Sequence, residues 1–257
     1  MQNNLILSTL FLSFFVQLIF FSYASLFKTD KVTDLSYGFT FIILAACALL
    51  KNGTFFSYQL LVSLMIFIWG VRLSGYLFIR IIKIKRDKRF DGIRENFLKF
   101  SKFWFFQAIA VWVISLPSTY LNNFKTDSPI NLLMIIGSII WLIGITTETI
   151  ADMQKFKFKN DPKNKGRWIQ SGIWKYSRHP NYFGEMLCWW GIFIFTVPFL
   201  SGIYWLTVTG PIFITFILLF VTGVPTLEKK YDERYKDNKE YQKYKSTTNL
   251  IIPGIKF

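Results

Sequence analysis

Seven long apolar runs constrain the fold of this chain more than any other feature of its sequence. Runs near twenty residues match the hydrocarbon thickness of a bilayer when they are helical, and a soluble domain of 257 residues does not normally contain several of them. Lipid cannot form hydrogen bonds with the backbone, so only helices or closed barrels cross a bilayer. These runs lack the alternation of apolar and polar residues that barrel strands show. The sequence therefore predicts an all-α, polytopic transmembrane bundle with spans at roughly 5–27, 35–50, 55–76, 103–121, 130–150, 182–200 and 203–224.

We expect a single membrane domain over residues 1–257, because no internal repeat, low-complexity linker or separable soluble module interrupts these runs. The first run resembles a secretory signal in its position only. It lacks a basic segment before it, its apolar stretch is long, and no clear small-residue cleavage site follows it. We therefore expect it to remain as a permanent helix.

Three polar segments predict how the bundle lies in the membrane. Residues 80–102, 152–181 and 225–257 hold 25 of the 30 Lys and Arg residues. With seven spans, all three segments fall on one side, which the positive-inside rule makes cytosolic. The sequence thus predicts an outside N-terminus and a cytosolic C-terminus, with these charges also touching anionic lipid. Because the location of the charge explains the net +15, it does not indicate nucleic acid binding.

The chain carries few residues that bind metals or nucleotides by recognised motifs. Both cysteines, Cys47 and Cys188, fall inside predicted spans, so no disulfide framework is expected. One histidine and two buried cysteines predict no Cys/His metal site. No Gly-x-Gly-x-x-Gly or Walker pattern occurs among the fifteen glycines, which excludes Rossmann and P-loop sites by motif.

The only histidine, His179, lies in the tetrapeptide Ser177-Arg-His-Pro180 at the entry to the sixth span. Proline suits the first position of a helix and holds the residue before it extended, so we expect the helix to begin at Pro180. The start of that helix offers free backbone N–H groups and a positive dipole end, with Arg178 and His179 beside them. This arrangement predicts a seat for a phosphate or a carboxylate.

Helical spacing places four side chains near one stripe of the sixth helix: His179, Tyr182, Glu185 and Trp189. The stripe is polar at its cytosolic end and aromatic toward the bilayer, which suits a charged head group outside and an apolar substrate inside. A carboxylate at a membrane boundary is costly to dehydrate, so Glu185 indicates function. The alternative interpretation makes Tyr182, Trp189 and Trp190 interfacial anchors and gives His179 a structural role.

The C-terminal tail is helical by composition over 228–245. Its mixed charges are typical of a solvated face. Its tyrosines, together with Arg234, could instead cover the cytosolic opening and stack on a base. The tyrosines that share a face of the expected helix are Tyr231 with Tyr235, and Tyr241 with Tyr244.

Two motifs in the C-terminal half resemble a known family. They are Gly172-Ile-Trp-x-Tyr-Ser-Arg-His-Pro-Asn-Tyr-Phe-Gly-Glu185 and Gly223-Val-Pro-x-Leu-Glu228-Lys-Lys-Tyr-Asp-Glu-Arg234. Both are similar to the steroid 5-alpha-reductase C-terminal family, and most closely to its DUF1295 branch. The resemblance extends from about residue 65 to the end, as a reductase-like core with a cytosolic tail at 225–257, and leaves the spans within 1–64 outside it.

The resemblance implies a coenzyme cavity that faces the cytosol and is formed by the C-terminal helices. Reductases of the superfamily bind NADPH there, and isoprenylcysteine carboxyl methyltransferases use a similar core for S-adenosylmethionine. For catalysis the resemblance points to His179, Tyr182 and Glu185. For coenzyme contacts it points to Lys155, Arg178, His179, Asn181, Tyr182, Glu185, Glu228, Tyr231 and Arg234.

Three functions follow as hypotheses. The first is an NADPH-dependent oxidoreductase that reduces a carbon–carbon double bond of an enone, sterol-like or enoyl lipid, with a positioned donor stabilising the developing oxyanion. The second is an S-adenosylmethionine-dependent lipid methyltransferase, and the third is a non-catalytic lipid-binding protein. The sequence leaves open the lipid, the oligomeric state, and the choice between a bacterial inner membrane and the endoplasmic reticulum.

Overall fold

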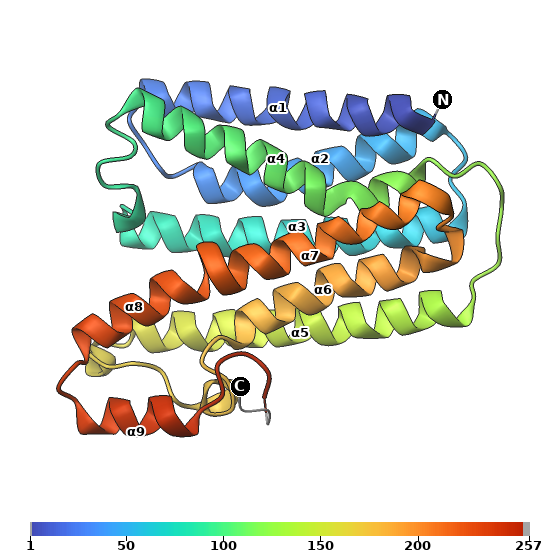
Figure 1. The fold of residues 1–257 in the computed structure, drawn as a ribbon. Coiled ribbons are helices and arrows are strands. Elements are labelled where there is room, and N and C mark those ends of the chain that lie inside the picture. The colour runs from blue at the N-terminus through green and yellow to red at the C-terminus, as the bar shows by residue number, and fades with distance from the viewer. Residues whose placement is uncertain (1, 254–257) are drawn as a thin grey trace. The chain divides into compact units, whose positions relative to one another are not determined.

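A computed structural model of the protein describes residues 2–253, with side chains from residue 5 onward. The described part is helical and contains no β-strand, and seven of its helical segments are long and apolar enough to cross a membrane. The predicted all-α, multi-pass membrane protein is therefore confirmed. The first six spans are α1 (Gln2–Leu26), α2 (Thr33–Asn52), α3 (Ser57–Ile84), α4 (Phe97–Asn122), α5 (Leu132–Asn160) and α6 (Pro180–Thr196) (Figure 1).

Two helices are longer than the apolar runs that predicted them. α3 continues past residue 76 to Ile84, and α5 continues past residue 150 to Asn160. The added turns carry Lys and Arg residues. These residues have high helix propensity, and their charge keeps the added turns out of the hydrocarbon core. The apolar run therefore marks the span, and the helix extends beyond it.

The last predicted span and the tail are more broken than the sequence suggested. A 3-10 helix (Gly202–Val208) leads into α7 (Thr209–Phe216), followed by a π-helical turn (Ile217–Val221) and α8 (Val224–Arg234). The prediction of a single helix over 228–245 is wrong, because α8 ends at Arg234. A second helix, α9 (Lys239–Thr247), begins after Asn238, whose side chain accepts a hydrogen bond from the backbone of Tyr241 at 3.0 Å.

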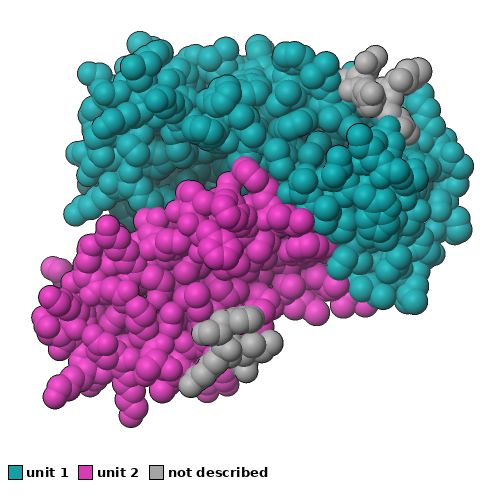
Figure 2. Space-filling view, in the orientation of Figure 1, with its two compact units in different colours: residues 1–137, 192–210 teal, residues 138–191, 211–257 magenta. Residues whose placement is uncertain are grey.

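The chain forms two compact units (Figure 2). Unit 1 comprises residues 1–137 and 192–210, and unit 2 comprises residues 138–191 and 211–257. In unit 1, α1 packs against α2 and α4, and α2 packs against α3. Buried polar side chains link these helices: Gln17 donates to Thr40 at 2.8 Å, and Gln107 donates to Gln17 at 2.9 Å. Such bonds hold helices together where lipid gives no hydrophobic driving force.

In unit 2, α5 and α6 approach until their backbones touch. A Cβ atom added at Gly184 would lie 2.6 Å from the backbone oxygen of Gly144 and from the backbone nitrogen of Glu148. A Cβ atom at Gly144 would in turn lie 2.7 Å from the backbone of Gly184 and Cys188. The glycine of the Tyr-x-Gly-Glu motif therefore has a packing reason, because only glycine permits this approach.

Candidate functional site

The motif loop before α6 is fastened to α5. Gly172 has a φ of +61°, which favours glycine, and an added Cβ atom would lie 2.3 Å from the side chain of Gln154. Gln154 accepts a hydrogen bond from the backbone N–H of Ile173 at 3.1 Å, and the indole of Trp174 donates to the carbonyl of Ala151 at 3.1 Å. These contacts fix the loop directly upstream of the motif histidine.

The C-terminal segment fastens the other side of the same loop. The backbone N–H of Arg178 donates to the carbonyl of Asn249 at 2.8 Å, and Ser177 forms an isolated β-bridge with Asn249. From α9, the hydroxyl of Tyr244 donates to the carbonyl of Trp174 at 2.8 Å. The loop 172–179 is thus held between α5 and the chain end, and its side chains have defined directions.

The predicted start of α6 at Pro180 is confirmed, but the side chains of Arg178 and His179 before it both contact Glu228 of α8. The Arg178 guanidinium holds Glu228 of α8 through both carboxylate oxygens, at 3.3 and 3.0 Å. It also donates to the carbonyls of Lys245 and Thr248, at 2.6 and 3.1 Å. Arg178 therefore joins the motif loop to α8 and α9.

His179 completes this cluster. Its side chain is 1% exposed, its Nε2 lies 2.8 Å from a carboxylate oxygen of Glu228, and its ring stacks on Tyr182 with centroids 5.6 Å apart. Burial lowers the pKa of His179 despite the attraction of Glu228, and the charges of Lys155 and Arg178 lower it further. The ring is therefore neutral near pH 7.

The neutral ring has a defined hydrogen-bonding direction. The proton belongs on Nε2, where it is donated to Glu228, which leaves Nδ1 as an acceptor. Nδ1 is buried and has no hydrogen-bond partner within the described residues, and the same is true of the side-chain oxygen of Asn181. Buried acceptors without partners are rare in folded proteins. They suit the N–H groups of an amide or an amine.

A pocket opens beside the cluster, entirely within unit 2. Its cavity volume is about 20 Å³, room for little more than one water molecule, so a larger ligand requires the lining side chains to move. Two of its walls are the loop before α6 and helix α8. These two elements carry the two sequence motifs that resemble the reductase family. Its lining residues are Trp168, Ile169, Trp174, Arg178, Glu228, Tyr231, Tyr241 and Tyr244.

Cations stand over the aromatic rings of this pocket. The ammonium of Lys155 lies 4.8 Å from the ring centre of Trp174, and that of Lys159 lies 5.8 Å from the ring centre of Tyr231. These distances are typical of cation–π contacts. In the sequence of unit 2, Lys and Arg outnumber Asp and Glu by sixteen to nine. The surroundings of the pocket are therefore positively charged.

Other predicted side chains lie near this cluster or further along α6. Glu185 is 9% exposed, and it follows the glycine that touches α5. Trp189 is 1% exposed, which excludes a role as an anchor at the membrane surface. Arg234 stands 5.5 Å over the ring of Tyr235 and does not line the pocket. Neither Glu185 nor Asn181 lines it either.

Several lining residues were missed or only partly foreseen. Trp168 meets Tyr235 and Tyr241 edge to face, with ring centroids 5.1 and 5.3 Å away. The available signal was an aromatic residue within a Lys-rich loop. Burial raises the pKa of Tyr241 and Tyr244 above the usual range for a phenol, so both remain neutral. Lys245 was also missed, and it pairs with Asp232 at 2.6 Å.

The sequence model of a protein family described as "Protein of unknown function (DUF1295)" matches residues 20–248. The chain belongs to the DUF1295 family. The match includes both motifs, and it begins within α1, upstream of residue 65 where the motif resemblance begins. It therefore spans most of both units.

A short segment is similar to a curated protein outside the DUF1295 description. The "Probable O-methyltransferase ustE" of Ustilaginoidea virens is 39% identical over 46 residues. That segment is 18% of this chain and 16% of the relative, so the chain matches about a sixth of the relative's length. No solved structure matches the chain.

Proposed function

We propose that this DUF1295 protein is a coenzyme-dependent membrane enzyme that uses NADPH to reduce a carbon–carbon double bond of an unsaturated lipid. The observation that carries the proposal is the pocket of unit 2, where Arg178, Glu228 and Tyr231 share one hollow under a rim of cations. An anionic dinucleotide gains from such surroundings, whereas a cationic coenzyme is repelled by them.

Residues that line the pocket and residues around it have separate tasks in this proposal. Lys155, Lys159 and Arg234 would attract phosphate groups, since Arg178 is already engaged by Glu228 and two carbonyls. Tyr231 and the other aromatic rings would stack on a base. The buried acceptors on His179 and Asn181 would receive amide N–H groups. When bound, the coenzyme supplies a hydride.

The protein supplies orientation and a proton to the same reaction. Negative charge develops on the conjugated oxygen of an enone as the double bond is reduced, and a positioned donor stabilises it. Tyr182, stacked on the neutral His179, is the hydroxyl we assign to that task, and Glu185 is the nearby carboxyl in the same helix. The apolar spans would admit a lipid substrate from the bilayer.

A second candidate is an S-adenosylmethionine-dependent lipid methyltransferase. The similar segment in a probable O-methyltransferase favours it, and so does the small, aromatic-lined volume of the pocket. Aromatic rings attract a sulfonium as they attract other cations. Within the described lining, the paired Arg178 leaves no free guanidinium to repel that charge.

One thermal-shift screen of the purified protein against NADPH, NADH and S-adenosylmethionine separates the candidates. A ligand at a hundred times its dissociation constant stabilises the fold by about 2.7 kcal/mol. Stabilisation by NADPH, followed by NADPH consumption with an enone lipid, is the expected result. Stabilisation by S-adenosylmethionine alone would replace the first candidate with the second, and a response to none of the three would favour a non-catalytic lipid-binding protein.

A matched pair of variants ties the result to the pocket. Glu228→Gln keeps the shape of the side chain but removes the charge that holds Arg178 and His179. The affinity for the coenzyme, measured by thermal shift, should therefore fall at least tenfold. Glu233→Gln makes the same change at an exposed position of α8 and should leave the response intact. Equal responses from both variants would place the coenzyme elsewhere.

A further inference from the structure

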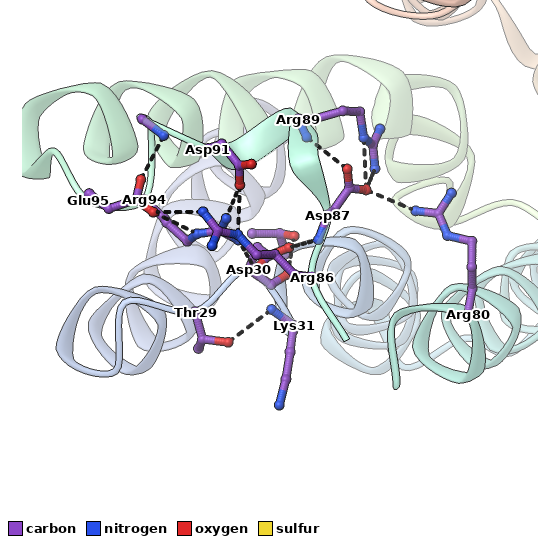
Figure 3. A network of polar contacts seen from close by, with 12 residues as sticks. Thr29, Asp30, Lys31, Arg80, Arg86, Asp87, Arg89, Asp91, Arg94 and Glu95 are labelled. Carbon is purple, nitrogen blue, oxygen red and sulfur yellow. Dashed lines mark hydrogen bonds and ion pairs between the residues drawn. The ribbon is translucent and has the colours of Figure 1, made fainter. Parts of the chain in front are cut away.

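Unit 1 carries a second concentration of charge, remote in sequence from the two motifs. It lies in the two connections 27–32 and 85–96, which join α1 to α2 and α3 to α4. The ends of these four helices meet at one end of the unit, and a network of polar contacts binds the two connections together (Figure 3).

Arginines engage the carboxylates in this network. Arg94, whose side chain is 4% exposed, contacts Asp30, Asp91 and Glu95. Across the network Arg80 pairs with Asp34 at 2.7 Å and with Asp87 at 3.5 Å, Arg89 pairs with Asp87 at 2.6 Å, and Arg86 pairs with Asp91 at 2.9 Å. Planar guanidinium groups suit carboxylates, so these pairs hold the connections in place.

Six exposed lysines of the same end lie outside these arginine–carboxylate pairs, and within the described residues none of the six forms an ion pair with a carboxylate. The acids that would otherwise neutralise them are already engaged by arginine. The six are Lys28, Lys31, Lys85, Lys88, Lys99 and Lys102.

Exposed apolar side chains adjoin these lysines. Leu26 and Phe27 precede Lys28 and are 77% and 62% exposed, and Phe97 and Leu98 precede Lys99 and are 64% and 68% exposed. All four lie at or beside the ends of candidate membrane spans. In a membrane protein this pairing puts apolar groups against acyl chains and lysines at the depth of the phosphates.

We propose that this lysine face of unit 1 binds the phosphate groups of anionic phospholipids. The occupant is lipid rather than an acidic protein, because the face joins cations to apolar side chains at the span boundary. Lysine suits the task, since a compact and mobile ammonium can follow headgroups that change position. The arginine network keeps the two connections together, and the lysines supply the contact.

The test uses the full-length protein in nanodiscs or mixed micelles, with phosphatidylglycerol as the probe and phosphatidylcholine as the neutral lipid. Each lysine near an anionic surface changes affinity by about fivefold at low salt. We expect a preference for phosphatidylglycerol, measured by thermal shift and by retained lipid in native mass spectrometry. Removing four of the lysines should weaken it at least tenfold. That variant is Lys28→Gln, Lys31→Gln, Lys85→Gln and Lys88→Gln.

Two matched variants make the result specific. One removes the same charge from unit 2, through Lys163→Gln, Lys236→Gln, Lys239→Gln and Lys243→Gln, and should retain the preference. The other converts the four lysines of unit 1 to arginine and should retain most of it. Equal losses in both glutamine variants, or no preference for phosphatidylglycerol in the native protein, would overturn the proposal. The proposal would also be overturned if the glutamine variant of unit 1 kept its lipid preference but lost binding of an acidic protein. Equal thermal unfolding in phosphatidylcholine checks that each variant is folded.

Discussion

Both units hold an arginine against a carboxylate, and the two sites differ in what surrounds that arginine. In unit 1, each terminal nitrogen of Arg94 and its Nε meets a carboxylate, supplied by Asp30, Asp91 and Glu95. In unit 2, Arg178 meets one carboxylate, Glu228, and completes its bonds with backbone carbonyls.

The difference extends to the space beside each arginine. Arg178 and Glu228 line a hollow, and a neighbouring buried nitrogen of His179 has no hydrogen-bond partner within the described residues. Asp87, in the network of unit 1, shows the opposite situation. Burial alone would raise its pKa, but hydrogen bonds and charge from Arg89 hold that pKa below the ordinary value. A cluster whose charges neutralise one another typically has a structural role. A cluster that borders a hollow and contains polar atoms without hydrogen-bond partners is typical of a ligand site.

The largest expected effect concerns the arginine of unit 1. Arg94→Met leaves the buried carboxylate of Asp30 without its partner, and breaking a buried ion pair in this way costs about 3–5 kcal/mol. Unfolding of the protein in detergent by denaturant measures the loss. Arg86→Met is the control: its side chain is 59% exposed, and the change should cost less than about 1 kcal/mol. Similar losses from the two variants would mean that Arg94 does not organise the network.

The close crossing of α5 and α6 gives the next effect. Gly184→Ala forces apart two backbones that touch at Gly144, and overpacking of this kind costs about 1–3 kcal/mol. The variant should also displace the start of α6 and weaken any coenzyme response. Gly75→Ala is the matched control within α3, where an added Cβ atom meets nothing within 4 Å. A stable Gly184→Ala protein would show that the two helices can separate without penalty.

Sequence reasoning succeeded where a local pattern determines the structure. The apolar runs predicted the spans, and Pro180 predicted the start of α6. The spacing of His179 and Tyr182 predicted that they would be neighbours, and their rings stack. Local patterns could not reveal that His179 meets Glu228, a residue 49 positions away, because that contact depends on how α8 and the motif loop pack.

The same limit explains the errors in the tail and in the pocket walls. Composition favoured helix throughout 228–245, but α8 ends at Arg234 and the side chain of Asn238 caps a new helix. Trp168 joins the pocket through its contacts with Tyr235, directly after α8, and with Tyr241 of α9. Nothing in the loop around it specifies those partners.

Arg178→Lys sharpens the comparison at the second arginine. The substitution keeps the charge but removes the planar group that grips both oxygens of Glu228 and the carbonyls of α9. Coenzyme affinity should fall roughly tenfold or more, about 1.4 kcal/mol, in a thermal-shift titration. Arg167→Lys, at an exposed position of the same unit, should change nothing. Unchanged affinity in Arg178→Lys would show that coenzyme binding does not depend on the planar group of Arg178.

The pH dependence of the free energy of unfolding tests whether His179, in the cluster of unit 2, is neutral. Burial lowers the pKa of His179 below its ordinary value of 6.5, so the unfolded chain takes up this proton at a higher pH than the folded chain does. The free energy of unfolding should therefore rise with pH from the lowered folded pKa up to about 6.5, and fall on acidification through that window.

The slope from this single group reaches at most about 1.4 kcal/mol per pH unit. Unfolding measured between pH 5 and pH 8 should show it in the native protein, and His179→Gln should remove it, because no other histidine exists in the sequence. A histidine held protonated by Glu228 would give the opposite sign, with stability lost as the pH rises. That sign would make the pair with Glu228 a self-neutralising ion pair like that of Arg94 and Asp30, and the contrast between the two units would disappear.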